Sequence, residues 1–441
     1  MAMIPQKPLF TWENLDALDD LHRLRLVLEA MPDEALMRLL ERARGRGRDD
    51  YPVRAVWNSL LAGIVYQHPS IESLRRELGR NAPLRQACGF DLLKGVSAVP
   101  TPRAYTTFLE NLMEHQDEID ALFDDLVERL GEALPGFGRV LAADGKAVRT
   151  HARPRGKDAP PLAPDGRRDT DADFGTKTYR GTREDGTPWE KIQHWFGYKV
   201  HLVVDAEQEL PVAYEVTRAS ASEMPQARRL LGGLTARHPD LVAGCEFWTS
   251  DKGQDDGKLI RRLWDDHEIK PAIDIRAMWK EPDETRVVPG TWNVVYDQQG
   301  TVYCHCPVTG CRRKMAYGGF EKDRETLKYR CPAVHYGLDC AGRSRCGVRG
   351  SVRIPMTLDR RLFTPLARSS YAWKRVYAKR SAVERVNSRL DGSFGLERHF
   401  IRGQRKMGLR VGLALVVMLA MALGRVRENQ PGKVRSLVGA A

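Results

Sequence analysis

The chain has 441 residues, too many for one ordinary hydrophobic core, so we expect two or three domains. Its formal net charge of +12 and pI of about 9.3 favour a polyanionic partner, of which nucleic acid is the usual one. The first ten residues have no signal-peptide pattern, and the longest apolar stretch, 411–423, is too short to cross a bilayer. We therefore expect a cytoplasmic protein without a membrane segment, in which 411–423 is a buried helix.

Residues 1–130 are predicted to form an all-helical domain. Apolar residues recur at helical spacing in 11–43 and again in 53–65, and Thr101 followed by Pro102 is a typical helix start. A Gly-Arg alternation at 44–48 separates the first two segments. Short helices joined by Gly and Pro turns are typical of a helix-turn-helix DNA reader, although helical packing alone gives the same pattern.

From Arg139 the apolar pattern changes to that of strands. We expect a strand ending at Asp144, further strands at 195–204, 210–217, 244–250 and 271–275, and helices at 222–237 and 255–266. Three meandering strands followed by alternating helices and strands predict an α/β fold, a ribonuclease H-like mixed five-stranded sheet with flanking helices. The polar stretch 150–190 is expected to be a long loop, whose basic run 149–157 either follows phosphates or is a solvated insertion.

Apolar residues alternate in 285–304 as expected of strands, so we expect this segment to be β-rich and to interrupt the fold. The core would occupy 139–276 and 369–430, with the insertion at 277–368 between its two parts. Within 371–410 there are 11 Lys or Arg against three Asp or Glu, a balance that favours an anionic partner over a merely solvated face.

Three acidic residues have distinctive settings. Asp144 and Asp251 each follow an apolar run, and their strands are neighbours in the expected sheet, so the two should lie side by side although they are 107 residues apart. Glu384 follows Tyr377 and Arg380 by seven and four residues, which places all three on one face of a helix. Taken singly, each aspartate could equally be a turn former or a helix cap.

Together these carboxylates are suited to hard divalent cations. Phosphodiester chemistry needs an activated oxygen nucleophile and a stabilised leaving oxygen, and two ions roughly 4 Å apart provide both. We expect Asp144 to bridge two Mg²⁺ ions, Asp251 to hold one and Glu384 the other, with Mn²⁺ as a substitute.

The order Tyr377, Arg380, Glu384 matches the first three places of the motif Tyr, two residues, Arg, three residues, Glu, six residues, Lys, and Asp391 stands at the fourth. In this motif the chain resembles the DDE transposases of insertion sequences, especially the group named after insertion sequence four. The stretches 51–90 and 196–231 resemble the helical N-terminal domain and the second and third strands and first helix of that family. Arg385 or Arg389 would replace the missing lysine.

The resemblance implies a cut-and-paste DNA transposase. Such a protein binds double-stranded DNA at the terminal inverted repeats of its element, works as a homodimer associated with the nucleoid, and joins the element to target DNA. The residues expected at the DNA are Tyr377, Arg380, Asn387, Lys146, Lys252 and Trp292, the last as counterpart of a tryptophan that holds a flipped base. Core packing is the alternative for Tyr377, and an ordinary surface position for the two lysines.

Two rival functions remain open at this stage. One is a DNA nuclease with a ribonuclease H fold, against which the helical domain and the large insertion argue. The other is an inactive, domesticated DNA-binding derivative, against which the retention of all three carboxylates argues.

Six of the eight cysteines fall within the insertion. A zinc ion bound as thiolates by Cys306, Cys331, Cys340 and Cys346 would hold a segment of low apolar content in shape. Their spacing lacks paired CxxC motifs, so reduced cysteines that pack within the insertion are the alternative.

Overall fold

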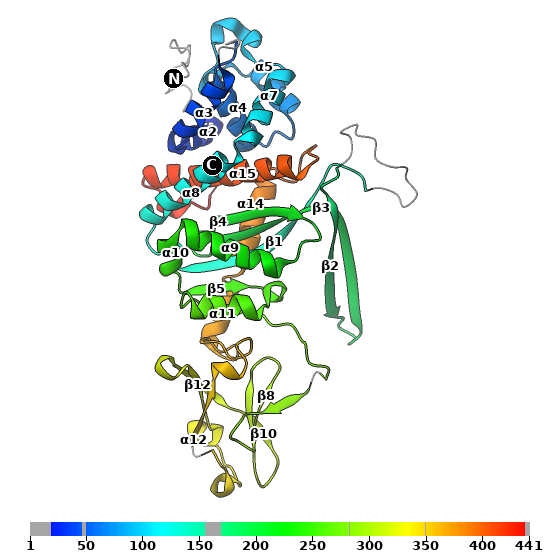
Figure 1. The fold of residues 1–441 in the computed structure, drawn as a ribbon, viewed down its shortest axis with the longest axis vertical. Coiled ribbons are helices and arrows are strands. Elements are labelled where there is room, and N and C mark those ends of the chain that lie inside the picture. Colours follow the sequence, from blue (N-terminus) through cyan, green and yellow to red (C-terminus); the bar gives the residue numbers. More distant parts are fainter. Residues whose placement is uncertain (1–18, 46–49, 155–168, 282, 349, 437–441) are drawn as a thin grey trace.

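The computed structural model describes residues 19–45, 50–154, 169–281, 283–348 and 350–436 (Figure 1). Residues 11–18, most of the Gly-Arg run 44–48 and the end of the basic run 149–157 lie outside this part of the chain. Figure 1 shows the N-terminal helices at one end, the sheet in the middle and the β-rich insertion at the other end.

The N-terminal region is helical, as predicted. Thr101 accepts a hydrogen bond from the Ala104 amide and so caps its helix, and Ser70 caps another through the Ser73 amide. The helices are α2 (Asp19–Ala30), α3 (Glu34–Arg44), α4 (Val53–Val65), α5 (Ile71–Arg80), α6 (Ala82–Cys88), α7 (Pro102–Glu114) and α8 (Gln116–Ala133), with a 3₁₀ segment η1 (Leu92–Ala98).

The central sheet has the ribonuclease H-like order β4-β3-β1-β5-β6. Strands β4, β3 and β1 are antiparallel neighbours, whereas β1, β5 and β6 run parallel. The strands are β1 (Val140–Arg149), β3 (Pro188–Asp205), β4 (Leu210–Arg218), β5 (Phe247–Ser250) and β6 (Lys270–Ile273). The predicted mixed sheet is therefore confirmed, but it has six strands and not five, because β2 (Asp173–Thr182) also pairs with β3.

Two local predictions in this sheet are wrong. The stretch 150–190 is not one long loop, because β2 (Asp173–Thr182) pairs with the first half of β3 and forms a hairpin that projects from the sheet (Figure 1). The hairpin exposes Phe174, Tyr179 and Ile192, so it lacks the buried face that would mark it in the sequence. Strand β1 also continues past Asp144 to Arg149, because β3 pairs with it along this whole length.

Helices cover both faces of the sheet. In Figure 1, α9 (Glu223–Arg237), α10 (Pro239–Ala243) and α11 (Gly257–Asp265) lie in front of it, and α14 (Ser381–Gly392) lies behind. The single helix expected from Tyr377 to Glu384 is divided, because α13 (Tyr371–Ala378) ends before Arg380, which precedes α14. Arg380 keeps helical dihedral angles, so its side chain still reaches Glu384 one turn later.

The insertion between β6 and α13 is β-rich, as predicted. Its two small sheets have the orders β10-β9-β8-β7 and β11-β12-β13 and enclose a hydrophobic cluster of their own. The strands are β7 (Thr285–Val287), β8 (Val294–Asp297), β9 (Val302–His305), β10 (Arg312–Lys314), β11 (Ala316–Glu321), β12 (Thr326–Arg330) and β13 (Ser351–Pro355), with a short helix α12 (Pro332–Tyr336).

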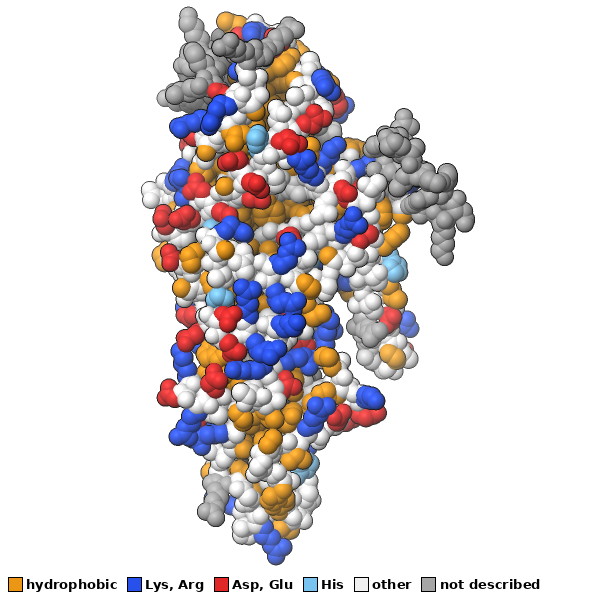
Figure 2. Space-filling view, in the orientation of Figure 1, with side chains coloured by type: hydrophobic (Ala, Val, Ile, Leu, Met, Phe, Trp, Pro, Cys, Tyr) orange, Lys and Arg blue, Asp and Glu red, His pale blue; other side chains and the backbone are white. Residues whose placement is uncertain are grey.

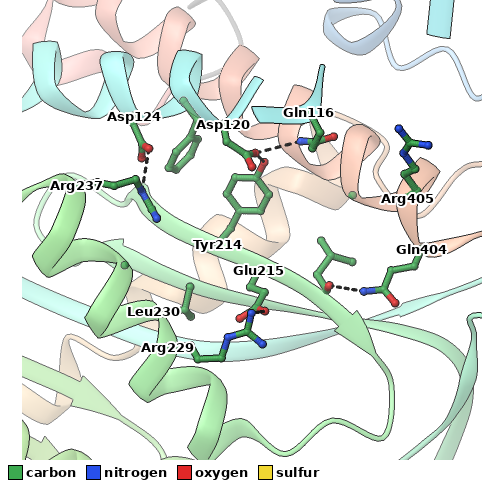
Figure 3. Close-up of a pocket in the computed structure, with 14 residues that line it drawn as sticks. Gln116, Asp120, Asp124, Tyr214, Glu215, Arg229, Leu230, Arg237, Gln404 and Arg405 are labelled. Atoms are coloured by element: carbon green, nitrogen blue, oxygen red, sulfur yellow. Dashed lines mark hydrogen bonds and ion pairs between the residues drawn. The ribbon is translucent and has the colours of Figure 1, made fainter. Parts of the chain in front are cut away.

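Helix α15 (Gln404–Arg427) joins the N-terminal helices to the sheet. By length and composition it could cross a membrane, but 89% of its apolar window is buried inside the protein, so it is a core helix. One hydrophobic cluster runs from the N-terminal helices through α15 to the sheet. Tyr214 of β4 reaches across this junction and donates a hydrogen bond to Asp120 of α8 at 2.7 Å (Figure 3).

Candidate active site

Asp144 and Asp251 lie side by side because of the register between β1 and β5. Their parallel pairing ends at Ala143 and Ser250, so the next residue on each strand is one of the two aspartates. Asp144 accepts a hydrogen bond from the Gly145 amide at 2.8 Å. Asp251 accepts one from the Gly253 amide at 2.6 Å and so caps a 3₁₀ turn, which shows that its capping role and a role in the site are compatible.

A third carboxylate, which sequence analysis did not single out, joins these two. One oxygen from each of Asp144, Glu223 and Asp251 lies within 4.8 Å of the other two. Glu223 is the first residue of α9 and also lies 3.4 Å from Lys199 Nζ. Among the described residues, no other group of three potential metal ligands is as close.

The negative charges of these three carboxylates repel one another. Burial, followed by the negative charges of Asp251 and Glu223, raises the pKa of Asp144 to about 6. A bound cation would relieve this repulsion, and carboxylate oxygens are the ligands that hard divalent cations prefer. The residues present therefore fit a divalent metal ion.

Glu384 lies at the same cavity but outside this close group. An open cavity of about 700 Å³ is lined by Asp144 and Lys146 from the sheet, Lys177 from the hairpin and Glu384 from α14. The Glu384 side chain is 54% exposed and pairs with Arg380 at 2.8 Å. Glu384 thus lines the cavity that Asp144 also lines, and its carboxylate is paired with the Arg380 guanidinium.

The other residues of the α13–α14 segment divide between packing and the cavity. Tyr377 stacks on Trp373 with ring centroids 4.5 Å apart. The Arg380 guanidinium carbon lies 5.9 Å from the centroid of the Tyr377 ring. Asn387 lines the cavity, and its buried Oδ1 has no hydrogen-bond partner within the described part of the chain. Asn387 therefore stands at the cavity wall with a buried oxygen that is left unpaired.

Lys146 pairs with Asp391, the residue that stands at the lysine position of the motif. Its Nζ lies 2.5 Å from Asp391 Oδ2, at the cavity that both residues line. Arg385 and Arg389, the substitutes expected from sequence, both pair with Glu209 instead and do not line this cavity. Lys252 directly follows Asp251 and is exposed.

Comparison with known families agrees with this geometry. A family described as Transposase DDE domain matches residues 135–420, and one described as Transposase domain (DUF772) matches residues 13–111. The chain belongs to the DDE transposases. It is therefore a metal-dependent DNA-cleaving enzyme, and its acidic cluster lies within the matched DDE domain. No curated protein matches the chain.

Basic side chains of this transposase gather on the sheet face that α9 and α11 cover. Figure 2 shows Lys and Arg concentrated over the face on which α9 and α11 lie. Those helices carry Arg228, Arg229, Arg237, Lys258, Arg261 and Arg262. A positive face of this kind attracts the phosphates of DNA.

Trp292 and the cysteines lie in the insertion. Trp292 is 61% exposed and adjacent to Gly347, next to the cysteines and not among the residues that line the Asp144 cavity. All six insertion cysteines border one small cavity of about 20 Å³. The Sγ atoms of Cys306 and Cys340 are 4.0 Å apart, and Asn293 donates to Cys346 Sγ at 3.3 Å.

Zinc would require these cysteines to draw closer. Tetrahedral Zn–S bonds of about 2.3 Å place sulfurs roughly 3.8 Å apart. Among the described residues, no three cysteine sulfurs lie within 4.8 Å of one another. Hydrogen bonds from Thr309 lower the pKa of the Cys306 thiol to about 6, which favours the thiolate that zinc binds.

Glu223 was missed because an acidic residue at a helix start usually only stabilises the helix dipole. The helix start near 222 was predicted, but only the return of the chain from β4 brings that start to the ends of β1 and β5. The usable signal was an acidic residue at the first position of the helix after the third strand, together with a glycine within two residues of each aspartate.

Proposed function

We propose that this DDE transposase binds the terminal inverted repeats of its insertion sequence, cleaves the strands there and transfers them into target DNA. The observation that carries the proposal is that Asp144 and Asp251 follow adjacent parallel strands and lie in one acidic group, and that Asp144 lines the same cavity as Glu384. Mg²⁺ is the proposed cofactor, as two ions for which Mn²⁺ can substitute; when bound, such ions activate an oxygen nucleophile and stabilise the leaving 3′ oxygen.

The cavity's own residues would position the DNA. Arg380 holds Glu384 and presents its guanidinium beside it, where a phosphate would bind. Asn387 offers an unpaired buried oxygen, and Lys146 and Lys252 offer positive charge. Tyr377 packs one ring face on Trp373, so it would contact DNA only through its edge or hydroxyl. Trp292 is proposed to hold a base at the far end of the insertion.

The assembly and the location belong to the same proposal. A homodimer would handle the two ends of the element together, in the cytoplasm and associated with the nucleoid. The helical region, proposed as residues 1–130, would recognise the repeats, with the core proposed as 139–276 and 369–430.

Zinc held by Cys306, Cys331, Cys340 and Cys346 is proposed to stabilise the insertion at 277–368. The cavity that these cysteines share and the lowered pKa of Cys306 support this proposal.

The direct test is metal-dependent cleavage of DNA that carries the sequences flanking the gene. We expect Asp144→Asn, Asp251→Asn and Glu384→Gln each to abolish cleavage with Mg²⁺ while DNA binding persists, because these side chains serve the metal ions and not the DNA. Asp323→Asn, at an exposed position of the insertion, is the control and should cleave normally. A wild-type chain that binds this DNA without cutting it would instead identify an inactive DNA-binding derivative.

A further inference from the structure

We propose that Glu223 is a ligand of the same divalent cation as Asp144 and Asp251, so that the site at the sheet edge is built from three carboxylates before Glu384 takes part. This inference rests on the proposed function and deepens it. It assigns a residue to the metal that lies outside the Asp, Asp, Glu set of the sequence motif.

The first support is that the backbone makes room for the Glu223 carboxylate at this place. A Cβ atom on Gly145 would lie 2.9 Å from Glu223 Oε1, and one on Gly253 would lie 2.3 Å from Glu223 Oε2. Real Cβ atoms almost never approach other atoms this closely, so a side chain at either position would displace the carboxylate. Gly145 follows Asp144 and Gly253 comes two residues after Asp251, so both glycines leave the space beside the aspartates that the Glu223 carboxylate fills.

The second support is the direction of the side chain. A glutamate in the first turn of a helix is commonly stabilised there by the helix dipole alone, and such a residue is free to point into solvent. Glu223 is only 22% exposed and points at two other carboxylates. That placement is unfavourable unless positive charge is present, and Lys199 at 3.4 Å supplies only part of it.

The third support is that Glu384 lies apart from the three close carboxylates and is paired with an arginine. Its carboxylate is paired with Arg380 and more than half exposed, and it is not part of the close group. Three carboxylates are thus in place for one ion without it. This arrangement leaves Glu384 for the second ion of a two-ion site.

The test is binding of Mn²⁺ alone to the full-length protein without DNA, measured by titration calorimetry. We expect Glu223→Gln to weaken Mn²⁺ binding by at least about tenfold, since loss even of an outer partner costs 10–100-fold. Glu384→Gln should stay within about twofold of wild type for this first ion. The matched control is Glu215→Gln, because Glu215 has the same 22% exposure and also pairs with a base, Arg229.

Two further variants separate a ligand from a merely structural glutamate. Glu223→Asp keeps the charge and should bind Mn²⁺ with intermediate affinity, even if Glu223→Gln is poorly folded. Lys199→Met breaks the Lys199–Glu223 pair and should bind Mn²⁺ at least as tightly as wild type, because it removes a competing positive charge. If Lys199→Met loses as much affinity as Glu223→Gln, Glu223 acts only through its ion pair and the inference is wrong.

The outcomes also distinguish this inference from the proposed function. If Asp144→Asn loses Mn²⁺ while Glu223→Gln and Glu223→Asp bind it normally, Glu223 is not a ligand and the proposed site stands. If wild type and Asp144→Asn both fail to bind Mn²⁺, the proposed metal site itself is overturned.

Discussion

Lys146 Nζ lies 2.5 Å from Asp391 Oδ2, and this pair joins the first strand of the sheet to the helix that carries Glu384. Asp391 occupies the place where the family motif has a lysine, and it pairs with a lysine from the strand. The Lys146 side chain is only 9% exposed, and its Nζ also lies 3.2 Å from Glu397 Oε1, so two carboxylates hold it in place. A basic group therefore lies beside this motif position, at the cavity that Lys146 and Asp391 both line.

We predict that Lys146→Ala weakens DNA binding and makes it less dependent on salt. A lysine that contacts one phosphate releases about one counterion, so the slope of log affinity against log salt should fall by about one unit. The measurement is DNA affinity between low and moderate salt. Lys322→Ala is the matched control, because Lys322 pairs with Glu268 on the surface away from the cavity. An unchanged slope in Lys146→Ala would restrict Lys146 to holding α14 in place.

Elemental analysis should find about one zinc ion per chain when the protein is purified without a chelator. We expect Cys306→Ser or Cys340→Ser to lower the zinc content strongly, because a structural site needs all four ligands. Cys311→Ser, at an exposed cysteine beside the same cavity, should retain zinc. Chelation should increase hydrogen exchange in the insertion and leave the sheet protected, since the insertion has its own hydrophobic cluster. A folded protein free of zinc would show that these cysteines only pack.

Stability should fall on acidification because of His201. Burial, followed by the charge of Lys199, lowers the pKa of His201 from 6.5 to about 4. Above pH 6.5 the histidine is neutral in both states; as the pH falls toward 4, only the unfolded state takes up the proton, so the free energy of unfolding decreases. At pH 5 the loss is about 2 kcal/mol.

The measurement is denaturant unfolding of wild type and His201→Gln, in a chelator, at pH 8, 7 and 5. Glutamine can keep the contact with Thr217, which His201 makes at 2.9 Å, but it does not titrate. We expect the decrease between pH 7 and pH 5 to be about 2 kcal/mol smaller in His201→Gln. Equal decreases in the two proteins would assign the pH dependence to other groups.

The sequence was sufficient for the order of the sheet and for the meeting of Asp144 with Asp251, because both depend on apolar strands whose pairing follows from topology. It was insufficient for the β2–β3 hairpin, where exposed residues on both faces leave no periodic signal. The contacts that Lys146 and Glu223 make could not be predicted from the sequence either. Each depends on which side chains two distant elements present to one another, and no local spacing records that.

Helix α15 imposes an order on folding during synthesis. Even α8, the last of the N-terminal helices, leaves the ribosome roughly 270 residues before α15 does, a delay on the order of 15 to 50 seconds at the usual rate of translation. Until then their apolar faces lack the partner that completes the shared cluster. Nascent chains are therefore exposed to aggregation, and a gene copy interrupted before residue 404 should yield no folded repeat-binding fragment that could compete with the intact protein for its DNA.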